Sequence, residues 1–188
     1  MHVLSIDIDY AYSPTISVYD DFVEGSKVTL EEQKKILDSL GMPSPKVNPT
    51  KIEILKQVVK KKTNPDTPTV ICEHHNEILK YLPKGKKFSI TNFDHHHDVY
   101  YPGWHEKEVL DEGNWVYHLN DSDIIKYTWV RNPDSEDLDD SIRLDFELEE
   151  MIEPDIEKFP DFDILFFCIS SHWTGDSGKE QILEVLRG

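Results

Sequence analysis

Short apolar runs alternate along this chain with segments in which apolar residues recur at every third or fourth position. The first pattern is typical of buried strands, and the second is typical of helices with one buried face. Stretches rich in proline, glycine and polar residues separate them. We therefore predict strands at residues 2–9, 69–72, 88–90, 124–130 and 163–170, and helices at residues 30–40, 52–62, 76–82, 113–119 and 178–188.

This alternation predicts an α/β fold in which helices connect the strands of a mainly parallel sheet. A chain of 188 residues can bury a sizeable core, so we expect residues 1–188 to form a single domain, a three-layer sandwich. Residues 142–149 alternate apolar and charged side chains, which indicates an exposed strand or hairpin. Ligands of open α/β sheets bind at the carboxyl ends of strands, so functional residues are expected there.

The richest of these positions follows the third predicted strand, where Asp94, His96 and Asp98 alternate with His95 and His97. In extended backbone, residues two apart point to the same side. The side chains of Asp94, His96 and Asp98 are therefore expected to converge. His95 and His97 are expected to face away and to support the ligands from outside the site. Two carboxylates and one imidazole on one side form a partial site for a divalent metal.

Two other predicted strands also end in ligand-type residues. Asp7 and Asp9 alternate with isoleucines, so both carboxylates are expected on one side of the first strand. A buried acidic pair is costly unless a cation neutralises it, which favours a ligand role over a solvated edge. The second strand leads into Glu73, His74 and His75, of which His75 is the preferred ligand and His74 the alternative.

Together these strand ends supply four carboxylates and two imidazoles, from Asp7, Asp9, His75, Asp94, His96 and Asp98. One ion of this kind takes about four to six ligands, so six protein ligands with bridging carboxylates suit two adjacent ions. Such a pair can activate a water molecule for attack on an electrophilic carbon or phosphorus. Ligands rich in carboxylate and without thiolate favour Mn²⁺, with Fe²⁺, Co²⁺ or Zn²⁺ as substitutes.

The composition argues against several classes of function. With 37 acidic and 20 basic residues the formal charge is −17, so nucleic acid is a poor partner and a cationic partner or substrate fits better. No apolar run approaches the roughly 18 residues of a membrane helix, and the amino-terminal segment is too short and acidic for a signal peptide. Cys72 and Cys168 lie in apolar runs and are expected to be buried free thiols of a cytoplasmic protein.

These motifs carry a resemblance to a known family. Residues 94–98 resemble the Asp-X-His-X-Asp motif of the arginase (ureohydrolase) superfamily, and residues 7–9 resemble its Asp-X-Asp motif. His75 resembles the lone histidine ligand that the superfamily carries on another strand. Residues 73–79 and 114–115 are similar to a small arginase-like branch that includes the peptide arginases. In arginases the Asp-X-Asp strand follows the other motif, whereas here it comes first, so a permuted strand order is expected.

The resemblance implies a metal-dependent hydrolase of linear amidines with two manganese ions. The implied ligands divide into two bridging carboxylates (Asp7 and Asp94), one set of His75 and Asp98, and a second set of His96 and Asp9. Water activated by the ions would attack the guanidinium carbon and release urea from arginine, which leaves ornithine. The substrate would be an arginine-containing peptide or a small guanidino compound.

The superfamily also places a histidine general acid after a Gly-Asn pair downstream of the metal motif. Gly113-Asn114 lies in that neighbourhood, with His118 as a candidate proton donor or a helix-surface histidine. Asn114 is either a substrate contact or a helix cap. His172, at the end of the last predicted strand, is the rival proton donor.

Three other interpretations stay open. A phosphoesterase with an Asp-His-His motif could use Asp94, His95 and His96, but it would leave Asp98 idle and would hold a polyanion on a very acidic protein. An amide deacetylase with a single zinc ion would not need the second acidic pair. A metal-dependent regulatory or binding protein would hold metal without turnover.

Overall fold

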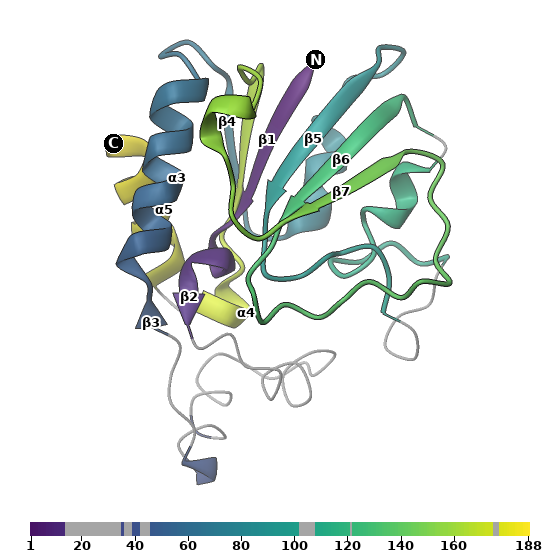
Figure 1. The fold of residues 1–188 in the computed structure, drawn as a ribbon. Coiled ribbons are helices and arrows are strands. Elements are labelled where there is room, and N and C mark those ends of the chain that lie inside the picture. Colours follow the sequence, from purple (N-terminus) through teal and green to yellow (C-terminus); the bar gives the residue numbers. More distant parts are fainter. Residues whose placement is uncertain (14–34, 36–38, 42–45, 102–107, 121, 175–176) are drawn as a thin grey trace.

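A six-stranded sheet forms the centre of the computed structural model, and all of its neighbouring strands run parallel (Figure 1). The structure describes residues 1–13, 35, 39–41, 46–101, 108–120, 122–174 and 177–188. Across the sheet the strands are β4 (Thr69–Cys72), β8 (Ile164–Cys168), β1 (His2–Asp7), β5 (Phe88–Phe93), β6 (Ile124–Val130) and β7 (Glu147–Met151). The prediction of an α/β sandwich with a mainly parallel sheet is confirmed.

The two faces of the sheet carry different layers. On one face, the helices α3 (Pro49–Lys62) and α5 (Gly178–Arg187) pack against each other (Figure 1). The other face is covered by loops and by the 3₁₀ helices η2 (His75–Lys80) and η3 (Tyr117–Leu119). The remaining short elements are η1 (Ile8–Ala11), β2 (Tyr12–Ser13), β3 (Lys46–Val47), η4 (Ile156–Lys158) and α4 (Ser171–Thr174).

Alternation along the strands gives each face its own core. Leu4 of β1 and Phe167 of β8 pack on the side of α3 and α5. Val3 and Phe166, one residue away in the same strands, belong to the core beneath η2 and η3. A parallel sheet that is covered on both faces has strands that are apolar almost throughout, so the polar side chains that remain in its central strands need a specific reason.

Helix α3 begins where the sequence supplies a cap and a proline. The side-chain oxygen of Asn48 accepts hydrogen bonds from the backbone N–H groups of Thr50 and Lys51, and Pro49 occupies the first turn. Its buried residues are those of the face predicted from the sequence, Ile52, Leu55, Val58 and Val59.

Several predicted elements differ from the structure. The helices predicted at residues 76–82 and 113–119 are the short 3₁₀ helices η2 and η3. Pro83 follows η2 closely and cannot continue a helix, and the Asn114 side chain bonds to nearby backbone in place of a helical turn. The exposed segment at residues 142–149 forms a strand only from Glu147 onward, and this strand extends the sheet in parallel, so no hairpin is made. The helix predicted at residues 30–40 lies mostly outside the described residues.

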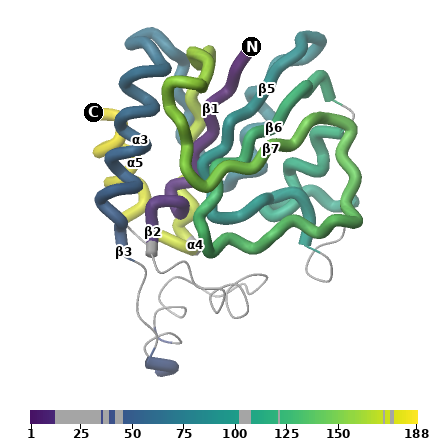
Figure 2. The backbone as a smooth tube through the Cα atoms, in the orientation of Figure 1, coloured from purple at the N-terminus to yellow at the C-terminus, as the bar shows by residue number. Residues whose placement is uncertain are grey.

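The order of the strands in the sheet differs from their order in the chain. Strand β1 lies inside the sheet, between β8 and β5 (Figure 2). The chain leaving β1 leads to β4 on one side, whereas the chain leaving β5 leads to β6 on the other. Adjacent strands whose connections run in opposite directions leave a crevice at their carboxyl ends, where open α/β sheets bind ligands.

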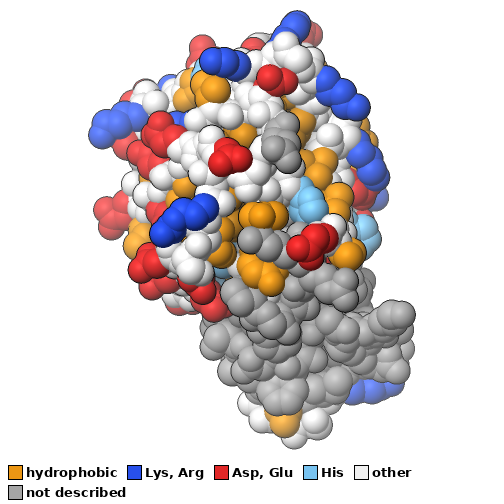
Figure 3. Space-filling view, turned by 90° about the vertical axis from the view of Figure 1, so that its right-hand side faces the viewer, with side chains coloured by type: hydrophobic (Ala, Val, Ile, Leu, Met, Phe, Trp, Pro, Cys, Tyr) orange, Lys and Arg blue, Asp and Glu red, His pale blue; other side chains and the backbone are white. Residues whose placement is uncertain are grey.

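The surface is mixed in character. On the face seen in Figure 3, hydrophobic, acidic and basic side chains are interspersed, with histidines among them. Both cysteines are free; Cys168 is buried as predicted, whereas Cys72 is only partly buried. Within the described part of the chain, no helix has the length and apolar character needed to cross a membrane.

Replacing Ile182 of α5 tests the packing of the helical layer. Ile182 is completely buried, whereas its neighbour Leu183 is 38% exposed. We expect Ile182→Ala to lower the free energy of unfolding by about 2–5 kcal/mol, because it removes buried methyl groups and leaves a cavity. The control Leu183→Ala is expected to change it by less than about 1 kcal/mol. Chemical denaturation measures both, and equal losses would contradict this packing.

Candidate metal centre

The polar residues of the central strands lie on one face and at one end of the sheet. Ser5 of β1 is the register partner of Asn92 in β5, and Asp7 is the partner of Cys168 in β8. Because side chains two apart share a face, these residues project to the side that carries η2, as does Asp94, two residues beyond Asn92. All five are buried.

The strand predicted at residues 2–9 ends two residues early, at Asp7. The Asp7 carboxylate accepts a hydrogen bond of 3.1 Å from the backbone N–H of Asp9 and thereby caps η1. Asp9 therefore lies in a 3₁₀ turn and does not share a strand face with Asp7, which corrects the prediction from alternation. The turn nevertheless buries the Asp9 carboxylate beside the same cluster.

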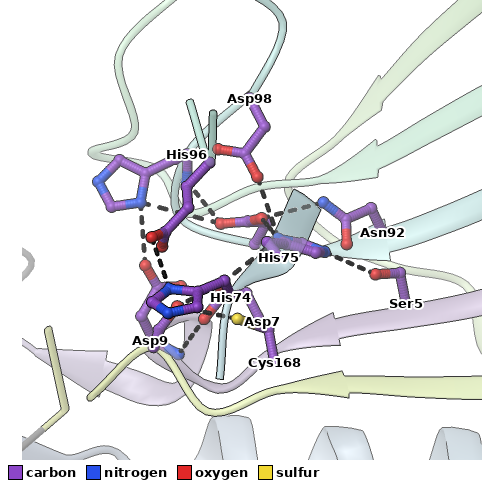
Figure 4. Close-up of polar contacts among 12 residues, drawn as sticks. Ser5, Asp7, Asp9, His74, His75, Asn92, His96, Asp98 and Cys168 are labelled. Atoms are coloured by element: carbon purple, nitrogen blue, oxygen red, sulfur yellow. Dashed lines mark hydrogen bonds and ion pairs between the residues drawn. The ribbon is translucent and has the colours of Figure 1, made fainter. Parts of the chain in front are cut away.

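Residues 94–98 are also not extended, so the alternation argument was wrong for this segment as well. The chain bends after β5, and the Asp94 carboxylate accepts a hydrogen bond of 2.8 Å from the backbone N–H of His96. Asp98 adopts a φ of 53°, which few residues other than glycine tolerate. The three side chains still converge on the other candidate ligands: Asp94 and Asp98 contact His75, and His96 contacts Asp9. Figure 4 shows His96 and Asp98 in this arrangement.

His75, at the start of η2, lies in the middle of the carboxylates (Figure 4). Its Nε2 atom is 2.7 Å from the Ser5 hydroxyl. Its Nδ1 atom is 3.0 Å from an oxygen of Asp94, 3.0 Å from an oxygen of Asp98 and 3.4 Å from an oxygen of Asp7. Phe166 stacks on the ring at 5.9 Å between centroids.

His96 occupies the other side of Asp94. Its Nδ1 atom lies 2.9 Å from an oxygen of Asp9 and 3.9 Å from an oxygen of Asp94. The indole of Trp173, in α4, packs on the His96 ring at 4.8 Å between centroids.

The candidate ligands fall into overlapping groups whose donor atoms lie within 4.8 Å of one another. The groups are His75 with Asp94 and Asp98, Asp9 with Asp94 and His96, and Asp7 with His75 and Cys168. All six ligand residues predicted from the sequence are thus brought together, and the thiol of Cys168 joins them. This cluster can hold a divalent metal ion, because carboxylate oxygens and imidazole nitrogens are its usual protein ligands.

Two buried polar atoms without hydrogen-bond partners in the described part of the chain indicate that a cation fits this cluster. Among the described residues, the His75 Nδ1 and Asp9 Oδ2 atoms make no hydrogen bond of acceptable geometry, despite their short contacts. A buried polar atom without a partner is costly, and each of these atoms faces other potential ligands. The donor set therefore fits a cation shared between them.

Burial and mutual repulsion shift the titration of these groups. Burial, and then the charges of Asp98, Asp9 and Asp7, raise the pKa of Asp94 well above its usual value. Burial and the charge of Asp7 raise the pKa of Asp9 to about 6. Burial alone would lower the pKa of His75, but the surrounding carboxylates outweigh it and raise that pKa well above its usual value. Without a cation, bound protons thus reduce the repulsion between the buried carboxylates.

Four residues that support the ligands were not singled out from the sequence. The Ser170 hydroxyl donates to Asp7 at 2.5 Å, the Asn92 amide to Asp94 at 3.0 Å and the Trp115 indole N–H to Asp98 at 2.6 Å. Ser5 contacts His75 as described above. Ser5 and Asn92 carry a recognisable signal, because they are polar, lie in apolar strands and share the face of the ligands.

A cavity of about 30 Å³ opens beside the cluster. Its lining residues are Asp7, His75, His96, Asp98, Glu112, Gly113, Ser170 and Trp173. His118 is not among them: it lies in η3, and its buried Nε2 atom has no hydrogen-bond partner among the described residues. Asn114 is fully buried, and its side chain bonds to the backbone of Asp111 and Val109. The backbone of His172 lies in α4, but its side chain is outside the described residues.

The other histidines of the two motifs lie around the cluster. The Nδ1 atom of His95 lies 3.2 Å from the Asn132 amide nitrogen and 3.3 Å from the Ser135 hydroxyl. His97 stacks on Tyr101 at 4.0 Å between centroids. His74 pairs with Glu112, with 2.7 Å between Nδ1 and Oε1.

Comparisons with known proteins add no identity: no family model, no curated protein and no solved structure matches this chain.

The metal-free protein is expected to lose stability as Asp9 ionises. A carboxyl whose folded-state pKa is raised from 3.8 to about 6 contributes stability at low pH, and that contribution is lost as the pH rises through this range. Asp9→Asn cannot ionise there. In EDTA, the unfolding free energy of the wild type relative to Asp9→Asn should therefore fall by about 2–3 kcal/mol between about pH 4 and pH 7. A difference independent of pH would contradict the burial of this carboxylate among like charges.

Asp94→Asn is expected to abolish metal binding and yet to leave the metal-free protein at least as stable as the wild type. The substitution removes a ligand that two of the groups share, and it also removes a buried charge that its neighbours repel. Elemental analysis after desalting and thermal unfolding in EDTA measure the two effects. The exposed control Asp66→Asn should change neither. Full metal content in Asp94→Asn would argue against the site.

Proposed function

We propose that this protein is a hydrolase that uses two divalent metal ions to cleave a guanidino group, converting peptidyl arginine to ornithine with release of urea. The observation that carries the proposal is the sharing of Asp94 between two ligand groups, one with His75 and Asp98 and one with Asp9 and His96. A carboxylate with one oxygen toward each group is the arrangement that a bridging ligand requires. Asp7, close to His75, is the second candidate bridge.

The donor chemistry favours manganese. Apart from the Cys168 thiol, the potential donors are four carboxylates and two imidazoles, which are hard or borderline ligands for which Mn²⁺ is well suited and Fe²⁺, Co²⁺ or Zn²⁺ are substitutes. A pair of such ions supplies a water molecule made nucleophilic near neutral pH. The protein supplies the rest: Ser170, Asn92 and Trp115 fix the carboxylates by hydrogen bonds, and the apolar core around His75 limits access of other water.

Charge favours a cationic substrate over a phosphodiester. Four carboxylates from Asp7, Asp9, Asp94 and Asp98 balance two divalent ions, so the loaded centre is close to neutral. Glu112 adds a negative charge at the cavity. This arrangement repels an anion and attracts a cation.

Two of the three rival interpretations conflict with a specific observation. The Asp-His-His phosphoesterase needs His95 as a ligand, but the ring of His95 lies against Asn132 and Ser135. A deacetylase with a single zinc ion would need only one ligand group and would leave the group of Asp9 and His96 without a role. A non-catalytic metal protein is distinguished only by the absence of turnover.

The choice of peptidyl arginine rests on the resemblance of residues 73–79 and 114–115 to the peptide arginase branch. The departing amine requires a proton. The candidate donors are His172, which precedes the cavity-lining Trp173 in the chain, and His118.

Incubation of the manganese-loaded protein with an arginine-containing peptide tests the proposal. We expect release of urea and a loss, for each converted arginine, of the mass of urea less that of water. Asp94→Asn and His96→Ala should release none, since each removes a ligand, while the exposed control Asp66→Asn should keep wild-type activity. Release of phosphate or nucleoside from a phosphodiester, or of acetate from an acetylated lysine peptide, would instead support one of the rivals.

A further inference from the structure

The loop at residues 109–115 forms one rim of the cavity and is tied to the metal cluster. The Asn114 side chain accepts a hydrogen bond from the backbone N–H of Asp111 and donates one to the carbonyl of Val109, at 2.9 and 2.7 Å. The next residue, Trp115, donates to the ligand Asp98 at 2.6 Å. The loop is therefore held in a fixed place relative to the candidate ligands.

This loop brings a carboxylate to the cavity that belongs to none of the ligand groups. Among the described residues that line the cavity, Glu112 is the one acidic residue outside those groups. Its side chain is 44% exposed, in contrast to the buried ligands below it, so it lies on the side that solvent and substrate reach. His74, 46% exposed, contacts one of its oxygens at 2.7 Å and orients the carboxylate.

A second wall of the cavity is aromatic. Trp173 lines the cavity and packs on the ring of the candidate ligand His96. The flat face of an indole attracts a planar cation such as guanidinium, and a carboxylate binds the same cation through charge-assisted hydrogen bonds. Glu112 and Trp173 together thus offer both contacts that a guanidinium group uses, directly beside the cluster.

On this basis we propose that Glu112 is the specificity-determining residue that binds the positive charge of the substrate. This inference rests on the function proposed above and adds to it the group that selects a guanidinium over an uncharged urea-type analogue. Glu112 is assigned to binding and takes no part in holding the metal. Removing its charge is therefore expected to weaken substrate binding without changing metal content.

Isothermal titration calorimetry on the manganese-loaded protein tests this with a matched pair of ligands, N-acetyl-arginine amide and the uncharged isostere N-acetyl-citrulline amide. We expect the wild type to bind the arginine ligand about 10- to 100-fold more tightly than the citrulline ligand, which is the contribution typical of one charge-assisted hydrogen bond. In Glu112→Gln this preference should disappear, with metal content and melting temperature unchanged. Glu108→Gln, at an exposed residue of the same loop region, should keep the preference.

The outcomes separate this inference from the proposed function. An undiminished preference for the arginine ligand in Glu112→Gln, or no preference in the wild type, would overturn the assignment of Glu112. A preference that is lost in Glu112→Gln, in a protein that releases no urea from peptides, would support the assignment of Glu112 and overturn the proposed reaction. In kinetic assays Glu112→Gln should raise KM for the peptide more than it lowers kcat, because the lost contact binds the substrate before and during the reaction.

Discussion

Like-charge repulsion is the constraint on which this structure depends. Four carboxylates, from Asp7, Asp9, Asp94 and Asp98, are buried around the imidazoles of His75 and His96 at the end of a parallel sheet. Burying one uncompensated carboxylate is expensive, and burying several together costs more with each one added. The apolar sheet and its two covering layers provide the stability against which this cluster is held. The neighbouring serine, asparagine and tryptophan donors orient the carboxylates but do not neutralise them.

Strands and the segments that follow them position different residues of this cluster. Strands fix the positions of Ser5, Asp7, Asn92 and Cys168 through their register, so the floor of the cluster is rigid. The 3₁₀ helix η2 and the loop after β5 supply groups that point back across the strand ends, among them His75 and Asp98. The loop that carries Glu112 is in turn bonded to Asp98 through Trp115. The solvent-facing rim is therefore linked through Trp115 to the candidate ligand Asp98, so the residue that we propose for substrate binding shares its support with the cluster.

The sequence predicts which residues form this cluster better than it predicts how they are arranged. Alternation in apolar runs correctly marks the face that carries Asp7, and it could also have marked Ser5 and Asn92. It fails for Asp9, which a 3₁₀ turn redirects, and for Asp98, whose left-handed backbone no spacing rule anticipates. The donors Trp115 and Ser170 meet the ligands only through tertiary contacts, at separations of 17 and 163 residues along the chain. The parallel sheet was predictable because most of its strands are short, largely apolar runs that alternate with helical segments; its strand order was not.

That strand order has a consequence for how the chain acquires its structure. Strand β1 precedes the other strands of the sheet in the chain, yet one of its two neighbours is β8, which lies between β1 and β4 and follows β1 by more than 150 residues. Until β8 arrives, β1 and β4 both present unpaired edges, and Asp7 lacks the serine that follows β8. Nascent chains of this protein are therefore expected to be prone to aggregation until β8 has been synthesised. Refolding is expected to be slow for a protein of this size, because β8 must pair with two strands that are distant from it in the chain.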